Sequence, residues 1–254
     1  MLEIILLSLI QGITEFLPIS SSSHLIILSK YLNFENQGLS IDVSLHIGSF
    51  MAVLVYFRIE LFKFLENKKL FFKIIVSSIP VMLVGFLLVK TNLIDKLRNI
   101  EVIGWMTLIF GVLLYYSDRL TLKKNISNNF NFKEAIFIGL FQILSLIPGV
   151  SRSGIAITAA RLLKFKRVDA AKISFLLSIP TLAAVTVYGS KNLLQSEDFS
   201  FSLLNLLAIL FSFLFSFTTI SYFLKFIKKF NLKIFAYYRI ILGVFLLTIS
   251  YLQN

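Results

Sequence analysis

Two polar clusters interrupt otherwise apolar stretches of this 254-residue chain. The first holds Glu15, the serines at 20–23 and His24, and the second is centred on Arg152. Among the 25 Lys and Arg residues, Arg152 is the one that we cannot place in a loop at a membrane surface. A guanidinium in hydrocarbon costs roughly 3 to more than 10 kcal/mol, so we expect Arg152 to face a polar cavity and an anion.

The residue types of the two clusters suit the binding and cleavage of a phosphate group. A carboxylate can hold a hard divalent cation, an arginine can clamp phosphate oxygens, and an imidazole can move protons. Gln11 stands four residues before Glu15 and shares its helix face. Helix N-termini after the serines at 20–23 and 151–153 would add free N–H groups and positive dipole ends. The plainer interpretation makes the serines caps or packing residues and pairs Glu15 with Arg152 as a buried ion pair.

The remaining conspicuous side chains have structural roles in our interpretation. His46 and Asp42 lie on a regular apolar stretch near its outer end, where we assign them to packing or interface contacts. Trp105 and the many phenylalanines are expected to face lipid or the core. The basic loops are expected to set topology and to contact anionic lipids.

Composition places the chain among integral membrane proteins. Hydrophobic residues make up 57% and charged residues 15%, with a mean hydropathy of +0.86, which excludes an ordinary soluble globular protein. The absence of cysteine excludes disulfides and thiolate chemistry, and two histidines argue against a zinc centre. The formal charge of +12 sits in short basic runs between apolar stretches. This pattern is typical of membrane-protein loops, and we expect no nucleic-acid binding.

The hydropathy pattern predicts six spanning helices and two broken hairpins. The predicted spans are Ile41–Phe57, Phe71–Val89, Ile100–Tyr116, Ala171–Tyr188, Phe201–Tyr222 and Phe235–Tyr251. Two further apolar stretches, at 3–34 and 134–165, each have a proline and clustered serines at the centre, which end one helix and cap the next. Each half of about 12–14 residues would reach roughly 18–21 Å, less than a hydrocarbon core of about 30 Å. We therefore predict that both are re-entrant helix hairpins in an all-α integral membrane fold.

Positive charge predicts which side each loop occupies. The loops at 58–73, 119–133, 161–172 and 225–239 hold four or five Lys or Arg each, whereas those at 30–40, 90–99 and 191–200 hold one to three. Six spans place all the rich loops on one side, the inside. Both termini then lie outside, the first hairpin enters from outside, and the second enters from inside.

The two hairpins are related in sequence. A shift of 131 residues aligns about nine of 32 positions, including Glu3 with 134, Gln11 with 142 and Ser20 with 151. Each hairpin precedes three spans, an odd number, so the second unit would be inverted relative to the first. We predict one membrane domain at 1–254, built of an inverted-topology repeat at 1–118 and 132–254. Such repeats place their site near the midplane, where the half-helix tips face each other.

The two clusters resemble motifs of the undecaprenyl pyrophosphate phosphatase family of bacterial membranes, also called the bacitracin-resistance type. The segment at 11–24, QGITEFLPISSSSH, is similar to its (Glu/Gln)-x-x-x-Glu element with the following serine and histidine. The segment at 148–154, PGVSRSG, is similar to its Pro-Gly-x-Ser-Arg-Ser element. Their order and separation match, and the hydropathy agrees along essentially the whole chain. The departures are Gln11 where many members have a second glutamate, Ser23 where glycine is common, and Ala156 in place of a threonine.

The resemblance implies an enzyme that hydrolyses undecaprenyl pyrophosphate to undecaprenyl phosphate and phosphate, recycling the carrier lipid of peptidoglycan synthesis. It implies a multi-pass protein of the bacterial plasma (inner) membrane, dependent on Mg²⁺ or Ca²⁺, with a site open to the outer, periplasmic side. It assigns the catalytic roles to Glu15, Ser21 as nucleophile, His24 and Arg152, with Ser151 and Ser153 beside the arginine. We predict that phosphate is bound by Ser20, Ser22, Ser151, Ser153 and Gly154, and that the metal is held by Glu15 with Gln11, although Gln11 weakens a two-carboxylate site. The expected partners are a polyprenyl pyrophosphate lipid and membrane lipids, with a homodimer as one candidate assembly.

The alternative function is a transporter or flippase of a phosphorylated lipid or small anion, because inverted repeats with broken helices are transporter architecture. It predicts movement of the substrate without release of phosphate. A structural scaffold ranks last because it leaves Arg152 unexplained.

Overall fold

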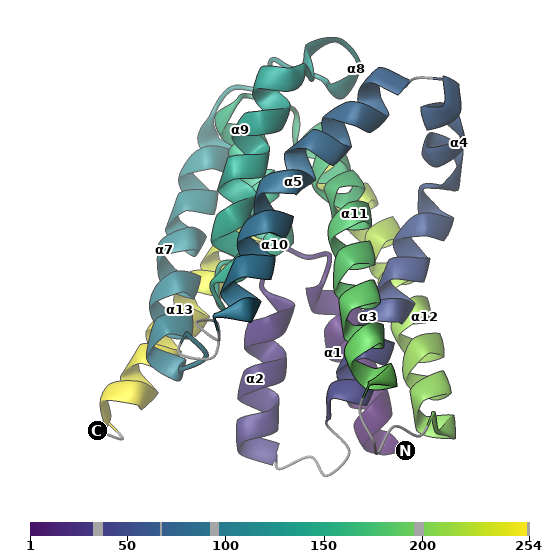
Figure 1. Cartoon of the computed structure of the whole chain (residues 1–254). Coiled ribbons are helices and arrows are strands. Elements are labelled where there is room, and N and C mark those ends of the chain that lie inside the picture. Colours follow the sequence, from purple (N-terminus) through teal and green to yellow (C-terminus); the bar gives the residue numbers. More distant parts are fainter. Residues whose placement is uncertain (33–37, 67, 92–96, 196–200, 253–254) are drawn as a thin grey trace.

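The computed structural model describes residues 1–32, 38–66, 68–91, 97–195 and 201–252, which form an all-helical protein (Figure 1). The elements in chain order are α1 (Leu2–Thr14), α2 (Ser21–Leu32), α3 (Leu39–Tyr56), α4 (Arg58–Glu66), α5 (Lys68–Lys90), α7 (Ile100–Arg119), α8 (Ile126–Asn129), α9 (Phe132–Ile143), the short 3₁₀ turn η1 (Leu144–Leu146), α10 (Arg152–Leu162), α11 (Arg167–Leu194), α12 (Leu203–Lys229) and α13 (Lys233–Leu252). Among these residues, β-structure is limited to one isolated bridge between Lys124 and Phe165.

Six of the helices are long and apolar enough to cross a membrane: α3, α5, α7, α11, α12 and α13. They coincide with the six predicted spans, and most extend a few residues beyond them, so this prediction is confirmed. The extensions arise because polar and charged residues at the helix ends also adopt helical turns; Lys68 and Arg167, for example, begin α5 and α11 before the apolar runs start. Hydropathy alone does not register these turns.

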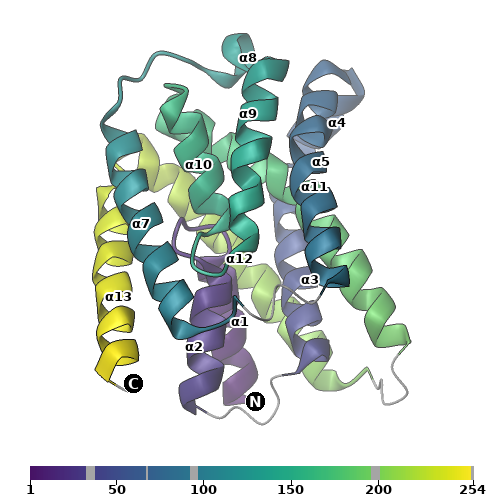
Figure 2. The same cartoon turned by 60° about the vertical axis from the view of Figure 1, so that its left-hand side comes forward.

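The two hairpins lie in opposite halves of the molecule. The views agree that α1 and α2 lie in the half that contains both marked termini, whereas α9 and α10 lie toward the other end (Figures 1 and 2). α1 packs against α12, and α9 packs against α5. α3 also packs against α12, and α7 packs against α13. Each hairpin therefore rests on a long helix from the other half of the sequence.

Small residues allow these helices to approach closely. Gly12 of α1 faces α12, where an added Cβ would lie 2.5 Å from the Cβ of Phe215. Gly139 of α9 faces the backbone of Ser77 on α5, and the Ser77 hydroxyl donates to the carbonyl oxygen of Ala135 at 2.6 Å. Such contacts are the usual basis of helix association in membranes, where burial of apolar surface brings little gain.

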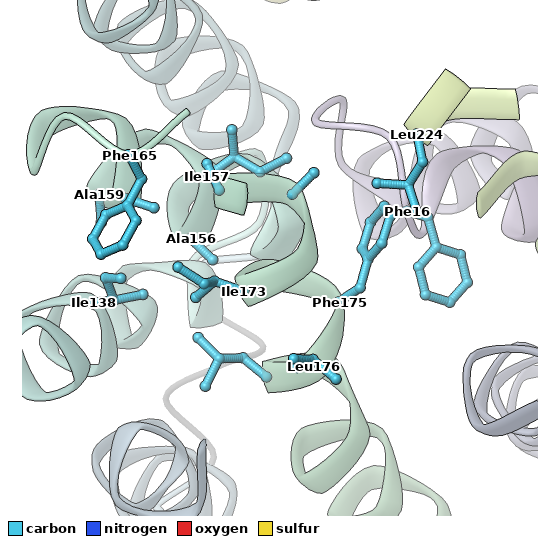
Figure 3. Close-up of a cluster of buried hydrophobic side chains, with 14 of the residues drawn as sticks. Phe16, Ile138, Ala156, Ile157, Ala159, Phe165, Ile173, Phe175, Leu176 and Leu224 are labelled. Carbon is cyan, nitrogen blue, oxygen red and sulfur yellow. The ribbon is translucent and has the colours of Figure 1, made fainter. Parts of the chain in front are cut away.

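An apolar cluster fixes the first hairpin to the second half of the chain. Phe16, directly after Glu15, is fully buried and packs edge-to-face on Phe175 of α11, with 5.5 Å between the ring centroids. Figure 3 shows Phe16 beside Phe175 and Leu224, with Ile173 and Ala156 continuing the cluster on the α10 side. Aromatic packing of this kind holds Glu15 in a defined position.

Asp118 holds together the ends of several helices opposite the termini. Its side chain is fully buried, lies 2.6 Å from the Nε of Arg167, and accepts the backbone N–H of Leu232 at 3.0 Å. Arg161 is fully buried beside it and donates to the carbonyl oxygens of Phe165 and Leu120. Our assignment of the basic loops to topology and lipid contacts is therefore wrong for Arg161. Charge counting cannot separate a loop cation from one that satisfies buried carbonyls.

Candidate active site

Both hairpin breaks have the same local geometry. α1 ends at Thr14 and α2 begins at Ser21, and η1 is separated from α10 by a Pro148-Gly149 turn. The residue before each second helix, Ser20 or Ser151, has a positive φ, 76° and 71° respectively. This left-handed conformation is uncommon outside glycine and is retained only where the surroundings enforce it. The two serines are 131 positions apart, the offset of the sequence repeat.

Glu15 is the centre of the polar contacts between the tips. Its Oε1 accepts from the Nη2 of Arg152 at 2.7 Å, and its Oε2 accepts from the Ser21 hydroxyl at 2.6 Å and the Gln11 amide at 3.1 Å. The side chains of Arg152 and Glu15 are only 16% and 6% exposed. The predicted meeting of an arginine and a carboxylate from opposite halves is therefore present. The Ser21–Glu15 contact places a base beside a hydroxyl, the arrangement that activates a nucleophile.

Arg152 keeps one donor available. Its Nη1 is buried and has no hydrogen-bond partner among the described residues. Buried polar atoms are normally hydrogen-bonded, so an unpartnered donor next to a cavity indicates a missing acceptor. A phosphate oxygen fits it, because the guanidinium fork matches phosphate geometry.

A cavity of about 510 Å³ lies between the tips, α3, α5 and α11. Its polar lining includes Glu15, Ser20, Ser21, Ser22, Ser151 and Arg152. Its apolar lining comes from α5 and α11 and includes Met82, Phe86, Val89, Val185 and Tyr188, all at least 36% exposed. The polar end is thus continuous with apolar side chains on the outer surface. This combination suits a ligand with a charged head and a long apolar tail.

The serines of the second cluster mainly hold the two tips in place. The Ser151 hydroxyl caps α10 by accepting from the N–H of Gly154 at 3.1 Å. The Ser153 hydroxyl donates to the carbonyl oxygen of Leu17 in the first tip at 2.7 Å. Ser153 and Gly154 are buried and do not line the cavity, and neither does the fully buried Gln11. Of the predicted phosphate-binding residues, the structure brings Ser20, Ser22 and Ser151 to the cavity.

The two histidines exchange the places expected from the sequence. His24 does not line the cavity: its Nδ1 lies 2.6 Å from the carbonyl oxygen of Ser20 and its Nε2 lies 2.6 Å from the hydroxyl of Tyr238. His46, which we assigned to packing, lines the cavity from α3. The sequence identifies which helix carries each imidazole, but the side it faces depends on how the helices pack.

Arg239 is a residue that the sequence reasoning missed. It is fully buried in α13, and its Nη2 donates to the carbonyl oxygens of Gly149 at 2.8 Å and Val150 at 2.9 Å. Its Nη1 donates to the carbonyl oxygen of Pro18 at 3.4 Å. The statement that Arg152 alone lies outside the loops is therefore wrong. The signal was present, because Arg239 falls inside the predicted span that begins at Phe235, yet we counted it with the preceding basic loop.

Arg239 and its neighbour Tyr238 together join both tips to α13. The turn that Arg239 contacts requires Gly149, whose φ is +100° and whose added Cβ would lie 2.7 Å from the carbonyl oxygen of Ile103. A guanidinium satisfies several buried carbonyls at once, which a lysine cannot do with the same planar geometry.

Comparisons with known proteins agree with this arrangement. A family model described as "Bacitracin resistance protein BacA" matches residues 4–245. The chain is 50% identical over 251 residues to an undecaprenyl-diphosphatase of Pelagibacter ubique, with 98% of each chain covered. It is 40% identical to an undecaprenyl-diphosphatase of Jannaschia sp. and 38% identical to one of Roseobacter denitrificans, covering 97% and 98% of each chain. Given the full-length match and the paired tips, the chain belongs to the bacitracin resistance protein BacA family.

Proposed function

We propose that this protein is an integral membrane phosphatase that hydrolyses undecaprenyl pyrophosphate to undecaprenyl phosphate and phosphate, recycling the cell-wall carrier lipid. The names of the relatives support the substrate. The single observation that carries the chemistry is the buried contact of 2.7 Å between Arg152 and Glu15, two residues that line the cavity. A cation and a base are thereby held together at membrane depth. The Nη1 of Arg152 is buried and has no partner among the described residues.

We propose that the chain lies in the bacterial plasma membrane as an inverted repeat with two re-entrant hairpins. α1 has 13 residues and α10 has 11, too short to span at about 1.5 Å per residue. In the proposed repeat α1 corresponds to α9 and α12 to α5, so the packing of α1 on α12 is repeated by that of α9 on α5. The positive φ of Ser20 is likewise repeated at Ser151. Both termini and the mouth of the site would face outward, which charge counting favours.

The substrate would bind with its two ends in the two parts of the cavity. The pyrophosphate would contact the Nη1 of Arg152, the hydroxyl of Ser22 and the free N–H groups of the first turn of α2, whose dipole favours anions. The prenyl tail would leave along α5 and α11, where Phe86 is 61% and Val185 is 47% exposed. Lipid-facing apolar side chains let the tail remain in the hydrocarbon while the head reaches the site.

Glu15 would act as the base of the reaction. The hydroxyl of Ser21, or a water that it orients, attacks the terminal phosphorus while its proton passes to Glu15, 2.6 Å away in the case of Ser21. The bond between this phosphorus and the bridging oxygen breaks, and the lipid monophosphate leaves with that oxygen. Where Ser21 is the nucleophile, a water then attacks the phosphoserine, the bond between Oγ and phosphorus breaks, and phosphate is released. Arg152 stabilises the charge on the phosphate oxygens. His24 would act as a second acid/base group. To exchange a proton with substrate, its Nε2 has to give up the contact with the hydroxyl of Tyr238.

The residues fit a Mg²⁺ ion that is completed by substrate better than a protein-only Ca²⁺ site. No group of three His, Cys, Asp or Glu residues lies together among the described residues. Glu15 supplies one carboxylate, and the Oε1 of Gln11 is buried without a hydrogen-bond partner in the described part of the chain. Mg²⁺ is commonly held by one or two carboxylates together with phosphate oxygens and water. When bound, the ion would neutralise charge on the phosphates.

Phosphate release from undecaprenyl pyrophosphate by the detergent-purified protein, with and without a chelator, tests the proposal. We expect release that the chelator stops. A transporter or flippase would move substrate in vesicles and release no phosphate, which would refute the enzyme. Labelled phosphate trapped on wild-type protein and lost in Ser21→Ala would identify a phosphoserine, whereas no label at full activity would favour direct attack by water.

A further inference from the structure

His46 reaches the cavity from a long helix that belongs to neither tip. It lines the cavity together with Glu15, Ser21 and Arg152, and its side chain is half-buried. α3 is held in place by α12 and α11 along its length. The imidazole is therefore presented to the polar end of the cavity by a rigid element.

The backbone fixes the tautomer of His46. Its Nδ1 lies 2.8 Å from the carbonyl oxygen of Asp42, one turn earlier in α3. A carbonyl oxygen only accepts, so Nδ1 must carry a proton and donate it. In the neutral ring the other nitrogen, Nε2, then has a lone pair and no proton. Among the described residues Nε2 has no hydrogen-bond partner, so it is available to a ligand.

His24 differs in this respect, because both of its nitrogens have protein partners, the carbonyl oxygen of Ser20 and the hydroxyl of Tyr238, each at 2.6 Å. Binding of a ligand by His24 would break one of these contacts. His46 has no such contact to lose at Nε2.

The charge in the cavity leaves a place for one more cation. Glu15 and Arg152 form an ion pair and largely cancel each other's charge. Among the described lining residues, His46 is the remaining side chain that can become positive near neutral pH. A diphosphate brings about two to three negative charges, of which the proposed Mg²⁺ ion would balance two and leave up to about one for the protein to balance when water is excluded.

We propose that His46 binds the phosphate groups of the substrate as an imidazolium, donating from Nε2, and takes up a proton when the substrate binds. The inference rests on the proposed function and adds a residue to that same site. Because Nδ1 already donates to Asp42, the neutral ring would point a lone pair at a phosphate oxygen, which is repulsive. The substrate therefore binds the protonated form more tightly, and KM rises with pH.

The charged and titratable groups around His46 are few. Glu15 and Arg152 face it across the cavity, Tyr188 of α11 lines the same cavity, and Asp42 lies on its own helix. α12, which packs on α3, has no titratable side chain from residue 203 to residue 221. The negative charge of Glu15 attracts an imidazolium at this position, and the positive charge of Arg152 repels it.

The test compares the wild type with His46→Gln and His46→Leu by measuring KM and kcat for undecaprenyl pyrophosphate. Measurements run from about pH 5.5 to about pH 8.5, on both sides of the ordinary imidazole pKa of about 6.5. An amide can donate from its nitrogen at every pH, so His46→Gln binds substrate without titrating. Dividing the wild-type KM by the His46→Gln KM cancels the ionisation of the substrate itself.

We expect this ratio to rise about 10- to 100-fold across the range, the effect of one hydrogen bond to a charged group. His46→Leu is expected to raise KM by a similar factor at low pH with kcat changed much less, which identifies lost binding. Met51→Leu, on the lipid-exposed side of α3, is the control and should match the wild type; thermal unfolding in detergent checks the fold of each variant.

Two results would overturn the inference. A ratio that stays constant with pH would show that His46 does not titrate on binding, and a wild-type KM in His46→Leu would show that it does not contact substrate. Absence of phosphate release by the wild type itself would overturn the proposed function together with this inference, so the two failures are distinguished.

Discussion

Replacing Glu15 with glutamine tests the proposed mechanism most directly. The change keeps the shape of the side chain but replaces one accepting oxygen by an N–H₂ group that only donates. If that group replaces Oε1, it meets the Nη2 of Arg152, another donor, now 2.7 Å from the oxygen. If it replaces Oε2, it faces the amide donor of Gln11, and the Ser21 hydroxyl has to accept from it instead of donating. The first orientation loses the Arg152 contact, the second reverses the Ser21 hydrogen bond, and both remove the base.

The structure sets the expected size of both effects. Losing one partner of a buried ion pair typically costs about 3–5 kcal/mol, and the 16% exposure of the Arg152 side chain lets water offset part of it. We therefore expect Glu15→Gln to lower the free energy of unfolding by about 2–3 kcal/mol. Removal of the base should lower kcat by about 10²- to 10⁴-fold.

Phosphate release by purified protein gives kcat, and thermal unfolding in detergent gives the change in stability. Glu101→Gln is the control, because Glu101 is an exposed residue at the start of α7 that accepts from Tyr251 at 3.0 Å, away from the cavity. It should retain wild-type activity. A folded Glu15→Gln protein with near-normal phosphate release would refute the assignment of Glu15 as the base.

Four other substitutions and one chemical treatment test separate parts of the protein. Ser21→Ala should lower phosphate release at least about 100-fold, whereas Ser22→Ala, which keeps the neighbouring hydroxyl, should retain measurable turnover; equal losses would contradict the choice of nucleophile. Arg239→Met removes a donor from the carbonyls of Gly149, Val150 and Pro18, of which that of Gly149 keeps the Thr107 hydroxyl at 3.5 Å. At about 1–3 kcal/mol for each of the other two, we expect about 2–4 kcal/mol lower stability by thermal unfolding, and unchanged stability would show that the carbonyls find other partners. Asp118→Asn should destabilise by about 3 kcal/mol yet leave KM unchanged, since the residue lies far from the cavity lining. Chelation should stop phosphate release and added Mg²⁺ should restore it; full activity in the chelator would contradict the metal proposal.

The sequence predicted the features that depend on local physics. Apolar runs of spanning length identified α3, α5, α7, α11, α12 and α13, because the hydrocarbon sets their minimum length. Proline followed by serines located both breaks, because proline ends a helix and serine caps the next one. The pairing of Glu15 with Arg152 was also predicted, because each is too costly to bury without the other.

What the sequence did not predict depends on the direction of side chains after packing. His24 lies at the break of the first hairpin and His46 on a regular apolar stretch, yet only the second lines the cavity. Arg239 and Arg161 resembled loop cations, since each stands at the edge of a run that contains lysines, but each donates to buried backbone carbonyls. The sequence shows that a cation is present. It does not show which acceptors the cation meets, because these come from distant parts of the chain.

The contact of Arg239 with both turns has a consequence for biosynthesis. Every residue that we propose to contact substrate precedes α13 in the chain, but the backbone of both turns is held by a side chain of α13. A ribosome-bound intermediate that lacks α13 would already contain every proposed reactive group and still leave the turns unsupported. Activity would then begin only after α13 has inserted into the bilayer.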